Sequence, residues 1–384
     1  MTDKNNPCSP GKRFAPSRST RLRTEIPGPK SRAVFDRLKA ASGGPYLVPL
    51  PVVVEKAHGA LICDVDGNVF IDFASAANGA IVGHTPEGMD NALAEQADAV
   101  THIYDRLGIS ENYVRLCELL NEITPDMGGT KRSILFPNQY AAWGGATTVL
   151  QNANPPSGVA MGNFTFPMKE MDDRHLKATA GIGFVYDPAS PLAPDKVERA
   201  AAHYRARGDL IYADEIFTGF GLTGKMFAVE HYPLRPDLMI LGGGMGTGLP
   251  LCALTGRADI MPRVEFQEQE VDSLQIRAAL WTIEFIQSQG LVARANQIGD
   301  VVLERIAEWQ ATFPKAITVH RLGALLTLEL DHAPEVVEAA RQQGLLLLAN
   351  ALKFILLRYP LMIPEEQLNE GLDILERALR SLLG

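Results

Sequence analysis

The stretch 209–250 constrains the fold most, because two short apolar segments in it each end at a turn of polar or glycine residues. Residues 209–214 read Asp-Leu-Ile-Tyr-Ala-Asp, which predicts a buried strand with the acid Asp214 at its carboxyl end. Residues 236–241 predict a second buried strand, which runs into the glycine-rich segment 242–248. Ligands of open α/β sheets bind beyond the carboxyl ends of such strands. Asp214 is therefore a candidate for ligand binding or catalysis.

The length of the chain fits two domains, or one large domain with a smaller satellite, and its composition is ordinary for a globular protein. The chain has 384 residues, of which 46% are hydrophobic and 21% are charged. Its net charge of −9 argues against a nucleic-acid surface, which needs a basic stripe. No apolar run approaches the about 20 residues that span a bilayer. The first residues also lack the apolar core of a signal peptide, so we expect a cytoplasmic protein.

The cysteines and histidines suggest neither a disulfide framework nor a metal site. Cys8, Cys63, Cys117 and Cys252 are widely spaced, which predicts reduced thiols. No histidine pair has the helical spacing of a zinc site, so we expect no metal. The run 64–67, Asp-Val-Asp-Gly, is similar to the start of a calcium loop but lacks the later acidic ligand, so it predicts a hairpin turn.

The sequence around Asp214 contains a series of short motifs: Ala213-Asp214-Glu215, Thr218-Gly219-Phe220-Gly221, Thr223-Gly224-Lys225, Phe227-Ala228, Glu230-His231, Pro236-Asp237 and Gly248-Leu249-Pro250. With these motifs the chain resembles the class III aminotransferases, which are pyridoxal-phosphate (PLP) enzymes of fold type I, and most closely their 4-aminobutyrate aminotransferase branch. The resemblance implies an α/β fold with a mixed, mostly parallel sheet and flanking helices, plus a smaller α+β domain. It also implies a homodimer.

Composition and the resemblance together predict four parts of the chain. Residues 1–24 are polar and basic, and we expect a mobile arm that orders against a partner. Residues 25–70 and 286–384 form the smaller domain. Residues 71–285 form the large, cofactor-type domain, which is shortened around 151–185, where the likeness fails.

The position of the catalytic lysine departs from the family pattern, and this change removes the amine that transamination requires. The resemblance implies that Asp214 pairs with the pyridine nitrogen of PLP, and that the next strand carries the Schiff-base lysine. The residue at that lysine position here is Gly243. Transamination needs an amine that forms the internal aldimine, and glycine supplies none. Lys225 follows the Asp214 strand and is a poor substitute, and the sequence does not place Lys169 or Lys177.

Other cofactor contacts implied by the resemblance are also changed. Asn138 and Gln139 replace the small Ser-Gly pair that opens the phosphate-binding helix, although Asn138 also fits a simple helix cap. Phe217 replaces a glutamine beside the cofactor. Glu268 replaces the threonine that reaches the partner subunit's phosphate, where its charge would repel a dianion, unless it lies in a solvated loop.

Two further departures concern the substrate and the cofactor ring. The substrate-carboxylate arginine of the family aligns with Leu356, for which Arg358 or Lys353 is a candidate substitute. Phe164 and Phe166 are candidates for the ring-stacking residue, although the spacing supports neither.

Two glycine motifs are better explained without a nucleotide. Gly219, Gly224 and Lys225 match most of a phosphate-binding loop, but Met226 stands where the magnesium-binding hydroxyl belongs. The run 242–248 does not fit a dinucleotide fingerprint, because Leu249-Pro250 is a poor helix start, so it predicts a loop.

These residues leave several functional hypotheses. The first is a class III aminotransferase fold that does not transaminate: a pseudoenzyme, or a repurposed or redesigned pocket, with PLP not covalently bound. The second is a residual PLP-dependent aminotransferase of the 4-aminobutyrate or ornithine type that uses a displaced lysine. The third is an enzyme without PLP in which Asp214 and Glu268 act as an acid–base pair. The fourth is a binding or scaffold protein.

Overall fold

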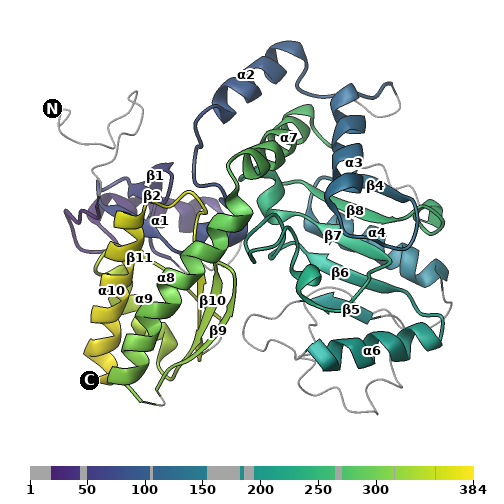
Figure 1. Ribbon diagram of the computed structural model, residues 1–384. Helices are drawn as coiled ribbons and strands as arrows, with labels where there is room; N and C mark the ends of the chain where they lie inside the picture. Colours follow the sequence, from purple (N-terminus) through teal and green to yellow (C-terminus); the bar gives the residue numbers. More distant parts are fainter. Residues whose placement is uncertain are drawn as a thin grey trace.

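The computed structural model describes residues 19–43, 50–103, 107–153, 182–185, 194–263, 270–314, 316–350 and 352–384. Within them the chain forms two lobes that lie side by side (Figure 1). The large lobe comprises the described residues of 89–288 and is built on a five-stranded sheet. The small lobe joins residues 29–72 to residues 291–383 and holds two four-stranded sheets.

The sheet of the large lobe is mixed, as the sequence predicts. Its strand order is β4 (Lys131–Phe136), β8 (Cys252–Arg257), β7 (Leu238–Leu241), β6 (Ile211–Glu215) and β5 (Ile182–Val185). Strands β5, β6 and β7 run parallel, whereas β8 pairs antiparallel with both β7 and β4. The two strands predicted from the stretch 209–250 are therefore neighbours, and their carboxyl ends lie at one edge.

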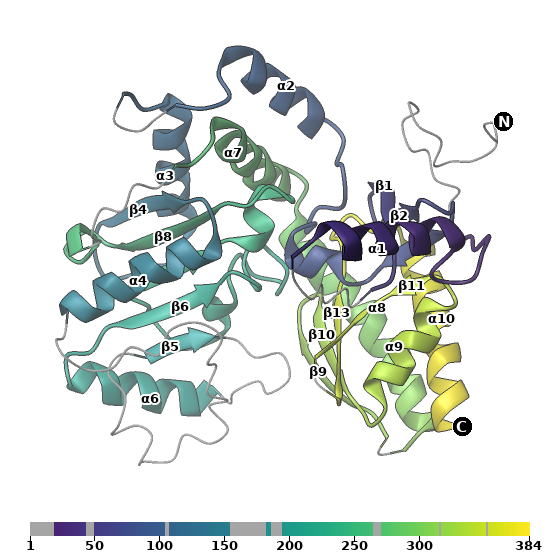
Figure 2. The ribbon, with the colours of Figure 1, turned by 180° about the vertical axis from the view of Figure 1, so that it is seen from behind.

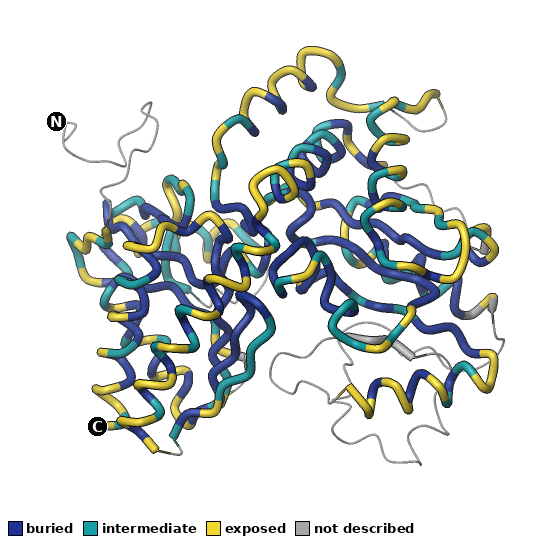
Figure 3. The backbone as a smooth tube through the Cα atoms, viewed as in Figure 1, coloured by how far each residue is buried: buried dark blue, intermediate teal, exposed yellow. Residues whose placement is uncertain are grey.

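Helices cover both faces of this sheet, which explains why its strands are apolar runs. Leu238 and Ile240 of β7 join the core cluster of α4, while Met239 and Leu241 join the cluster of α7 on the other face. Figure 2 shows α4 across the sheet, and Figure 3 shows the strands as buried and α2 as largely exposed. The described helices of the large lobe are α2 (Met89–Ala99), α3 (Glu111–Ile123), α4 (Gln139–Ala153), α6 (Pro194–Ala206) and α7 (Ser273–Ser288).

The small lobe combines strands from both ends of the chain. One sheet is β1 (Val54–His58), β2 (Leu61–Asp64), β3 (Val69–Asp72) and β11 (Leu345–Leu346); the other is β12 (Leu348–Asn350), β13 (Phe354–Arg358), β10 (Leu325–Glu329) and β9 (Thr318–Leu322). Strand β11 runs parallel to β3. The helices of this lobe are α1 (Pro29–Ala41), α8 (Leu291–Thr312), α9 (Ala333–Arg341) and α10 (Glu365–Leu383).

Apolar residues at helical spacing predict amphipathic helices over residues 111–123 and 364–383, the second with a stripe of leucines, and the structure has both helices. Helix α3 has the predicted range 111–123, and α10 begins one residue later than the predicted range 364–383. The leucine stripe predicted for α10 is buried, except for Leu382 in the last turn, which is 41% exposed. A helix with one apolar stripe buries that stripe against its lobe, so the pattern determines both its position and its orientation.

The hairpin turn predicted from residues 64–67 is confirmed. Gly67 has a φ of 87°, and its N–H donates to the carbonyl of Asp64. The second acid, Asp66, caps α1 by accepting hydrogen bonds from the backbone N–H groups of Lys30 (2.8 Å) and Ser31 (2.9 Å). Among the described residues, no three His, Cys, Asp or Glu side chains gather as a metal site would require.

The prediction that all four cysteines are reduced is wrong for Cys63, which is disulfide-bonded. Cys117 and Cys252 are free. Spacing along the sequence does not show which thiols a fold brings within bonding distance, and for this reason the sequence prediction failed. In the ranges that the structure describes, no helix is both long enough and apolar enough to span a membrane.

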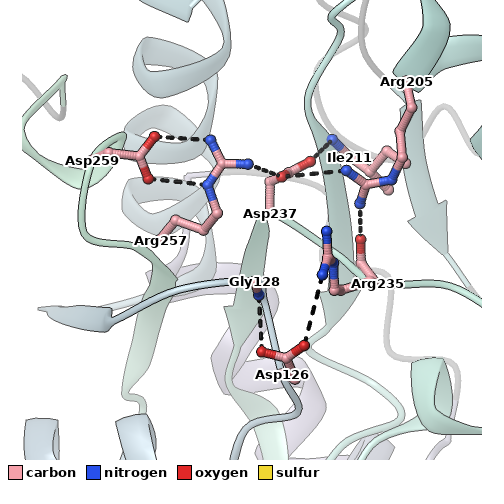
Figure 4. Close-up of polar contacts among 8 residues, drawn as sticks. All are labelled: Asp126, Gly128, Arg205, Ile211, Arg235, Asp237, Arg257 and Asp259. Carbon is pink, nitrogen blue, oxygen red and sulfur yellow. Dashed lines mark hydrogen bonds and ion pairs between the residues drawn. The ribbon is translucent and has the colours of Figure 1, made fainter.

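A network of ion pairs holds the amino ends of β6 and β7, away from Asp214 (Figure 4). Asp237 is buried, and its carboxylate lies 2.6 Å from Nη1 of Arg257 and 3.7 Å from Nη1 of Arg205. It also accepts a hydrogen bond of 2.8 Å from the backbone N–H of Ile211. The network therefore connects α6, β6, β7 and β8 at the end of the sheet opposite the candidate site.

Candidate functional site at the carboxyl ends of the parallel strands

Asp214 lies at the carboxyl end of β6, as predicted, and both of its carboxylate oxygens accept hydrogen bonds. Oδ2 accepts from the indole Nε1 of Trp143 at 2.8 Å, and Oδ1 accepts from the backbone N–H of Ile216 at 3.1 Å. Burial raises the pKa of Asp214, and these two hydrogen bonds oppose that shift without cancelling it. The carboxylate of Asp214 is therefore already hydrogen-bonded to other groups of the same chain.

Helix α4 positions Trp143 against the sheet. The helix begins at Gln139, and Oδ1 of Asn138 accepts from the N–H of Ala141 at 3.0 Å, which is the cap that the sequence allows. Four residues into the helix, the ring of Trp143 contacts Tyr140 edge to face, with centroids 5.6 Å apart. The sequence alone places the large side chain of Trp143 near the site, but only the fold shows that its indole N–H donates to Asp214.

Gly243 begins the short 3-10 turn η4 (Gly243–Gly246) that follows β7, and it has no room for a side chain. Its φ is +56°, a conformation that favours glycine. A Cβ atom built at this position would lie 2.1 Å from the carbonyl oxygen of Ile216. At Gly242 a Cβ atom would lie 2.6 Å from Sγ of Cys252. Both glycines are required by this local backbone, which packs closely against β8 and the residue after β6.

Asn78 lies next to the same turn and is fully buried. It ends the short 3-10 segment η1 (Ser75–Asn78), and its Nδ2 lies 3.7 Å from the Cβ position at Gly243 and 3.3 Å from that at Gly244. Within the described part of the chain, neither Nδ2 nor Oδ1 of Asn78 has a hydrogen-bond partner. Asn78 was not predicted as a site residue, because one asparagine in a Gly-Ala-rich segment carries no motif.

Phe217 and Arg358 lie against each other on the small-lobe side of this region. The side chain of Phe217, just beyond β6, is 38% exposed, and Cζ of Arg358 lies 5.7 Å from the centre of its ring. Arg358 ends β13 and is only 8% exposed. Burial lowers its pKa to about 10, and its Nε has no hydrogen-bond partner.

Glu215 is the next residue after Asp214 and has a structural role. Its carboxylate is fully buried and accepts from Oγ1 of Thr218 (2.5 Å) and from the backbone N–H groups of Ala228 (3.0 Å) and Val229 (2.7 Å). Burial raises the pKa of Glu215 to about 7, against the effect of these hydrogen bonds. Glu215 therefore fastens β6 to the 3-10 turn η3 (Ala228–His231).

Several predicted site residues are not brought to Asp214 by the described structure. Glu268, Lys169, Lys177, Phe164 and Phe166 lie outside the described residues. Lys225 donates through Nζ to the carbonyl of Glu230 at 2.6 Å, and Nζ of Lys353 lies 3.3 Å from Asp331. Leu356 is a buried residue of β13, and Gln139 is the first residue of α4.

Comparisons with known proteins agree with this architecture. The profile of the family described as "Aminotransferase class-III" matches residues 44–138 and 189–379 and leaves 139–188 unmatched between them. The 4-aminobutyrate aminotransferase of Mycobacterium leprae is 31% identical, over 94% of this chain and 98% of its own length. The leucine/methionine racemase of Thermococcus litoralis is 27% identical, over 86% of this chain and 90% of its own length.

The fold is also that of solved structures. The ornithine delta-aminotransferase of Plasmodium falciparum superposes with a TM-score of 0.81 at 20% identity, covering 92% of this chain and 99% of that one. The acetylornithine aminotransferase of Elizabethkingia anophelis gives a TM-score of 0.78 at 21% identity, covering 92% of this chain and 99% of that chain. The fold class predicted from the sequence, PLP-dependent fold type I, is confirmed, and this chain belongs to the class III aminotransferase family.

Proposed function

We propose that this chain is a class III aminotransferase-family protein that does not transaminate, and whose site takes a ligand other than covalently held PLP. The observation that carries the proposal is the hydrogen bond from Trp143 to Asp214. It engages one of the two carboxylate oxygens that a ligand's ring nitrogen would have to reach. A buried acceptor that is already satisfied gains little from exchanging one donor for another.

Gly243 supports the same proposal, as the residue that stands where the family carries its Schiff-base lysine. A glycine cannot form an aldimine or carry a proton. The local backbone also leaves no space for a longer side chain, because the carbonyl of Ile216 occupies the Cβ position. Lys225 and Lys353 do not replace the missing lysine in this structure. Lys225 donates to the carbonyl of Glu230, and Lys353 pairs with Asp331.

The described residues therefore do not fit PLP in the manner that the family resemblance implies. Asn138 caps α4, and Asp214 is bonded to Trp143. Both side chains are committed to contacts within the protein rather than to a bound cofactor. The pseudoenzyme or repurposed pocket is the function that these residues support best.

The proposal is tested by incubating the purified protein with PLP, reducing it with borohydride and measuring its intact mass and the labelled peptides. We expect no stoichiometric adduct and no visible absorbance band of a lysine aldimine. Scattered partial labelling of surface lysines agrees with the proposal, since it reflects free aldehyde in solution. One fully labelled lysine, with the absorbance band, would overturn it.

A residual PLP-dependent aminotransferase is the second candidate, and the observation favouring it is the 31% identity to a 4-aminobutyrate aminotransferase over nearly the whole chain. It requires a displaced lysine, for which Lys169 and Lys177 are the candidates. Turnover of 4-aminobutyrate or ornithine with 2-oxoglutarate, lost in Lys169→Ala or Lys177→Ala, would establish it. The acid–base pairing of Asp214 with Glu268 stays a sequence prediction.

We also propose that the protein is a homodimer, as the family resemblance implies, and that it is cytoplasmic. Large apolar side chains are exposed in the single chain at Leu107 (86%), Ile109 (66%) and Tyr140 (73%). Such exposure is expected where a second subunit covers the surface. Light scattering coupled to gel filtration tests this, and a monomer at micromolar concentration would contradict it.

A further inference from the structure

Helix α1 has an apolar side that the described part of the protein covers only partly. Val34, Phe35 and Leu38 lie on one side of the helix, and each is half-buried. None of the three belongs to a core cluster of the described residues. The only fully buried residue of the helix is Ser31. A helix of a folded protein normally packs its apolar stripe against a core, so α1 lacks the partner that its sequence requires.

Side-chain hydrogen bonds and ion pairs fasten α1 to other described residues only at its first turn. Asp66 accepts from the backbone N–H groups of Lys30 and Ser31 and from Oγ of Ser31 (2.6 Å). Nη1 of Arg32 lies 3.0 Å from the carboxylate of Glu25. From residue 33 to the end of the helix, no side chain makes a hydrogen bond or ion pair with a described residue outside the helix. The later turns of α1 are therefore available to another surface.

The amino-terminal part of the chain is basic, although the whole chain is acidic. Residues 1–56 contain 11 Lys and Arg but only 4 Asp and Glu, whereas residues 57–384 contain 25 and 41. Helix α1 has one acid, Asp36, and four exposed basic residues, which are Lys30, Arg32, Arg37 and Lys39. Arg37 has no ion pair with a described residue, and Nζ of Lys39 lies 3.9 Å from Asp36 of the same helix. A surface that matches α1 therefore combines apolar and acidic side chains.

A surface of that kind occurs on the large lobe of the same chain. Helices α2 and α3 both pack against α7, and residues 87–126, which include them, contain nine Asp and Glu but two Lys and Arg. The acids of this segment that the structure shows exposed are Glu87, Asp90, Glu95, Asp98, Glu111, Glu118, Glu122 and Asp126. Leu107, Ile109 and Val114 are exposed among them. Single exposed apolar residues are ordinary, but several together, flanked by charged residues, indicate an interaction surface.

The two surfaces do not meet within one chain. Figures 1 and 2 show α1 on the small lobe and α2 and α3 beside α7 on the large lobe, apart in both views. In a dimer with two-fold symmetry each copy supplies both surfaces, so the same contact forms twice. A second copy of this chain therefore matches the charge and the apolar residues of both surfaces at once.

We propose that α1 of one protomer docks on α2 and α3 of a second copy, and that the reciprocal contact completes the dimer. Val34, Phe35 and Leu38 then face the exposed apolar residues of the large lobe. Arg37 and Lys39 face the acids of α2 and α3. The inference rests on the homodimer proposed above and assigns the surfaces that form it. The cofactor site takes no part in it.

An exchange of charges between the two surfaces tests the contact. The first variant, Arg37→Glu/Lys39→Glu, makes this part of α1 acidic. The second, Glu111→Lys/Glu118→Lys, changes two exposed acids that lie on the same side of α3 as Val114. Each variant alone places like charges opposite each other, so we expect a dimer Kd about 10- to 100-fold above that of the wild type. Analytical ultracentrifugation of a dilution series measures this Kd.

A mixture of the two variants should dimerise again. In the mixed dimer both contacts pair opposite charges, so its Kd should return to within about threefold of the wild-type value. The matched control is Lys196→Glu/Arg199→Glu, which changes the net charge equally at exposed positions of α6, and its Kd should equal that of the wild type. A mixture that stays as dissociated as the separate variants, or a control that dissociates equally, would overturn the contact.

The apolar side of α1 has a variant of its own, Phe35→Ala/Leu38→Ala. These side chains lie outside the core clusters, so we expect the dimer Kd to rise about 10-fold or more while the dissociated chain keeps the wild-type Tm. A lower Tm with an unchanged Kd would give these residues a role within one chain only, and the proposed docking would be wrong.

An anionic membrane is the competing partner for a basic amphipathic helix. Flotation with vesicles of phosphatidylcholine and phosphatidylserine distinguishes it, and we expect the wild type not to float. Flotation that Arg37→Glu/Lys39→Glu abolishes would assign α1 to lipid instead of a second copy. A monomeric wild type refutes the homodimer itself, whereas a dimeric wild type with unaffected charge variants refutes only the docking of α1. Neither outcome alters the borohydride result.

Discussion

Trp143 and Asp214 come from different layers of the large lobe and meet through a hydrogen bond of 2.8 Å between the indole N–H and a carboxylate oxygen. Helix α4 and strand β6 are thereby joined at the edge where ligands of α/β sheets bind. A carboxylate that a tryptophan satisfies is less available to any incoming group. Asp214 matches the family motif, but its hydrogen bond to Trp143 gives this residue a structural role that does not require the family's cofactor.

Replacing Trp143 with phenylalanine should lower the free energy of unfolding by about 1–3 kcal/mol, because Asp214 loses a donor in a partly buried position. Urea denaturation measures this difference. Trp281→Phe is the control, since Trp281 stacks on Phe285 with centroids 4.6 Å apart and phenylalanine keeps that ring contact. Equal losses in the two variants would mean that the bond to Asp214 contributes nothing specific.

Gly243→Ala should destabilise the protein by about 2–4 kcal/mol, because a methyl group would meet the carbonyl of Ile216 and the backbone has positive φ. Gly248→Ala is the control that measures the cost of the positive φ alone. Gly248 also has positive φ, 94°, but nothing lies within 4 Å of its Cβ position, so about 1 kcal/mol is expected there. Chemical denaturation of both variants tests the difference, and similar losses would contradict the close contact.

We expect Glu215 to lower the free energy of unfolding as pH rises from about 4.5 to about 7. Burial raises the pKa of Glu215 to about 7, so the folded state holds this proton more tightly than the unfolded chain, whose pKa is near 4.5. The stabilisation is fully present below pH 4.5 and is lost as pH passes 7. Unfolding titrations of wild type and Glu215→Gln should differ in slope within this window. Parallel curves would remove Glu215 as the source.

Asp237→Ala should cost about 1–3 kcal/mol, because the backbone N–H of Ile211 loses its buried acceptor, while Arg257 loses one carboxylate and keeps Asp259. Asp126→Ala is the contrast: Asp126 is 76% exposed and lies 3.8 Å from Arg235, so its loss should change stability by less than about 1 kcal/mol. Thermal unfolding distinguishes the two. A large effect at Asp126 would show that exposure is a poor guide to these ion pairs.

The sequence predicts much of the fold because apolar periodicity and turn residues act locally. The range of α3, the buried stripe of α10 and the turn at Gly67 all follow from neighbouring residues. Strand β13 was not predicted, since the short apolar run around Leu356 has no alternation that distinguishes a strand from a buried helical segment.

The site was predictable only where one residue carries a pattern. Asp214 could be located from the strand that precedes it, and Gly243 from the turn that follows the next strand. The bond from Trp143 depends on two elements far apart in the chain, and the unpaired state of Arg358 and Asn78 depends on the described residues that surround them. The role of Glu268 stays a prediction from the sequence.

The pairing of β3 with β11 has a consequence for how the chain is made. Ile71 lies beside Leu345 in a parallel ladder, so an early strand needs a partner from near the end of the sequence. During translation, β3 leaves the ribosome long before β11 exists. The small lobe can therefore close only after synthesis is nearly complete, and a nascent chain stopped before β11 cannot finish it.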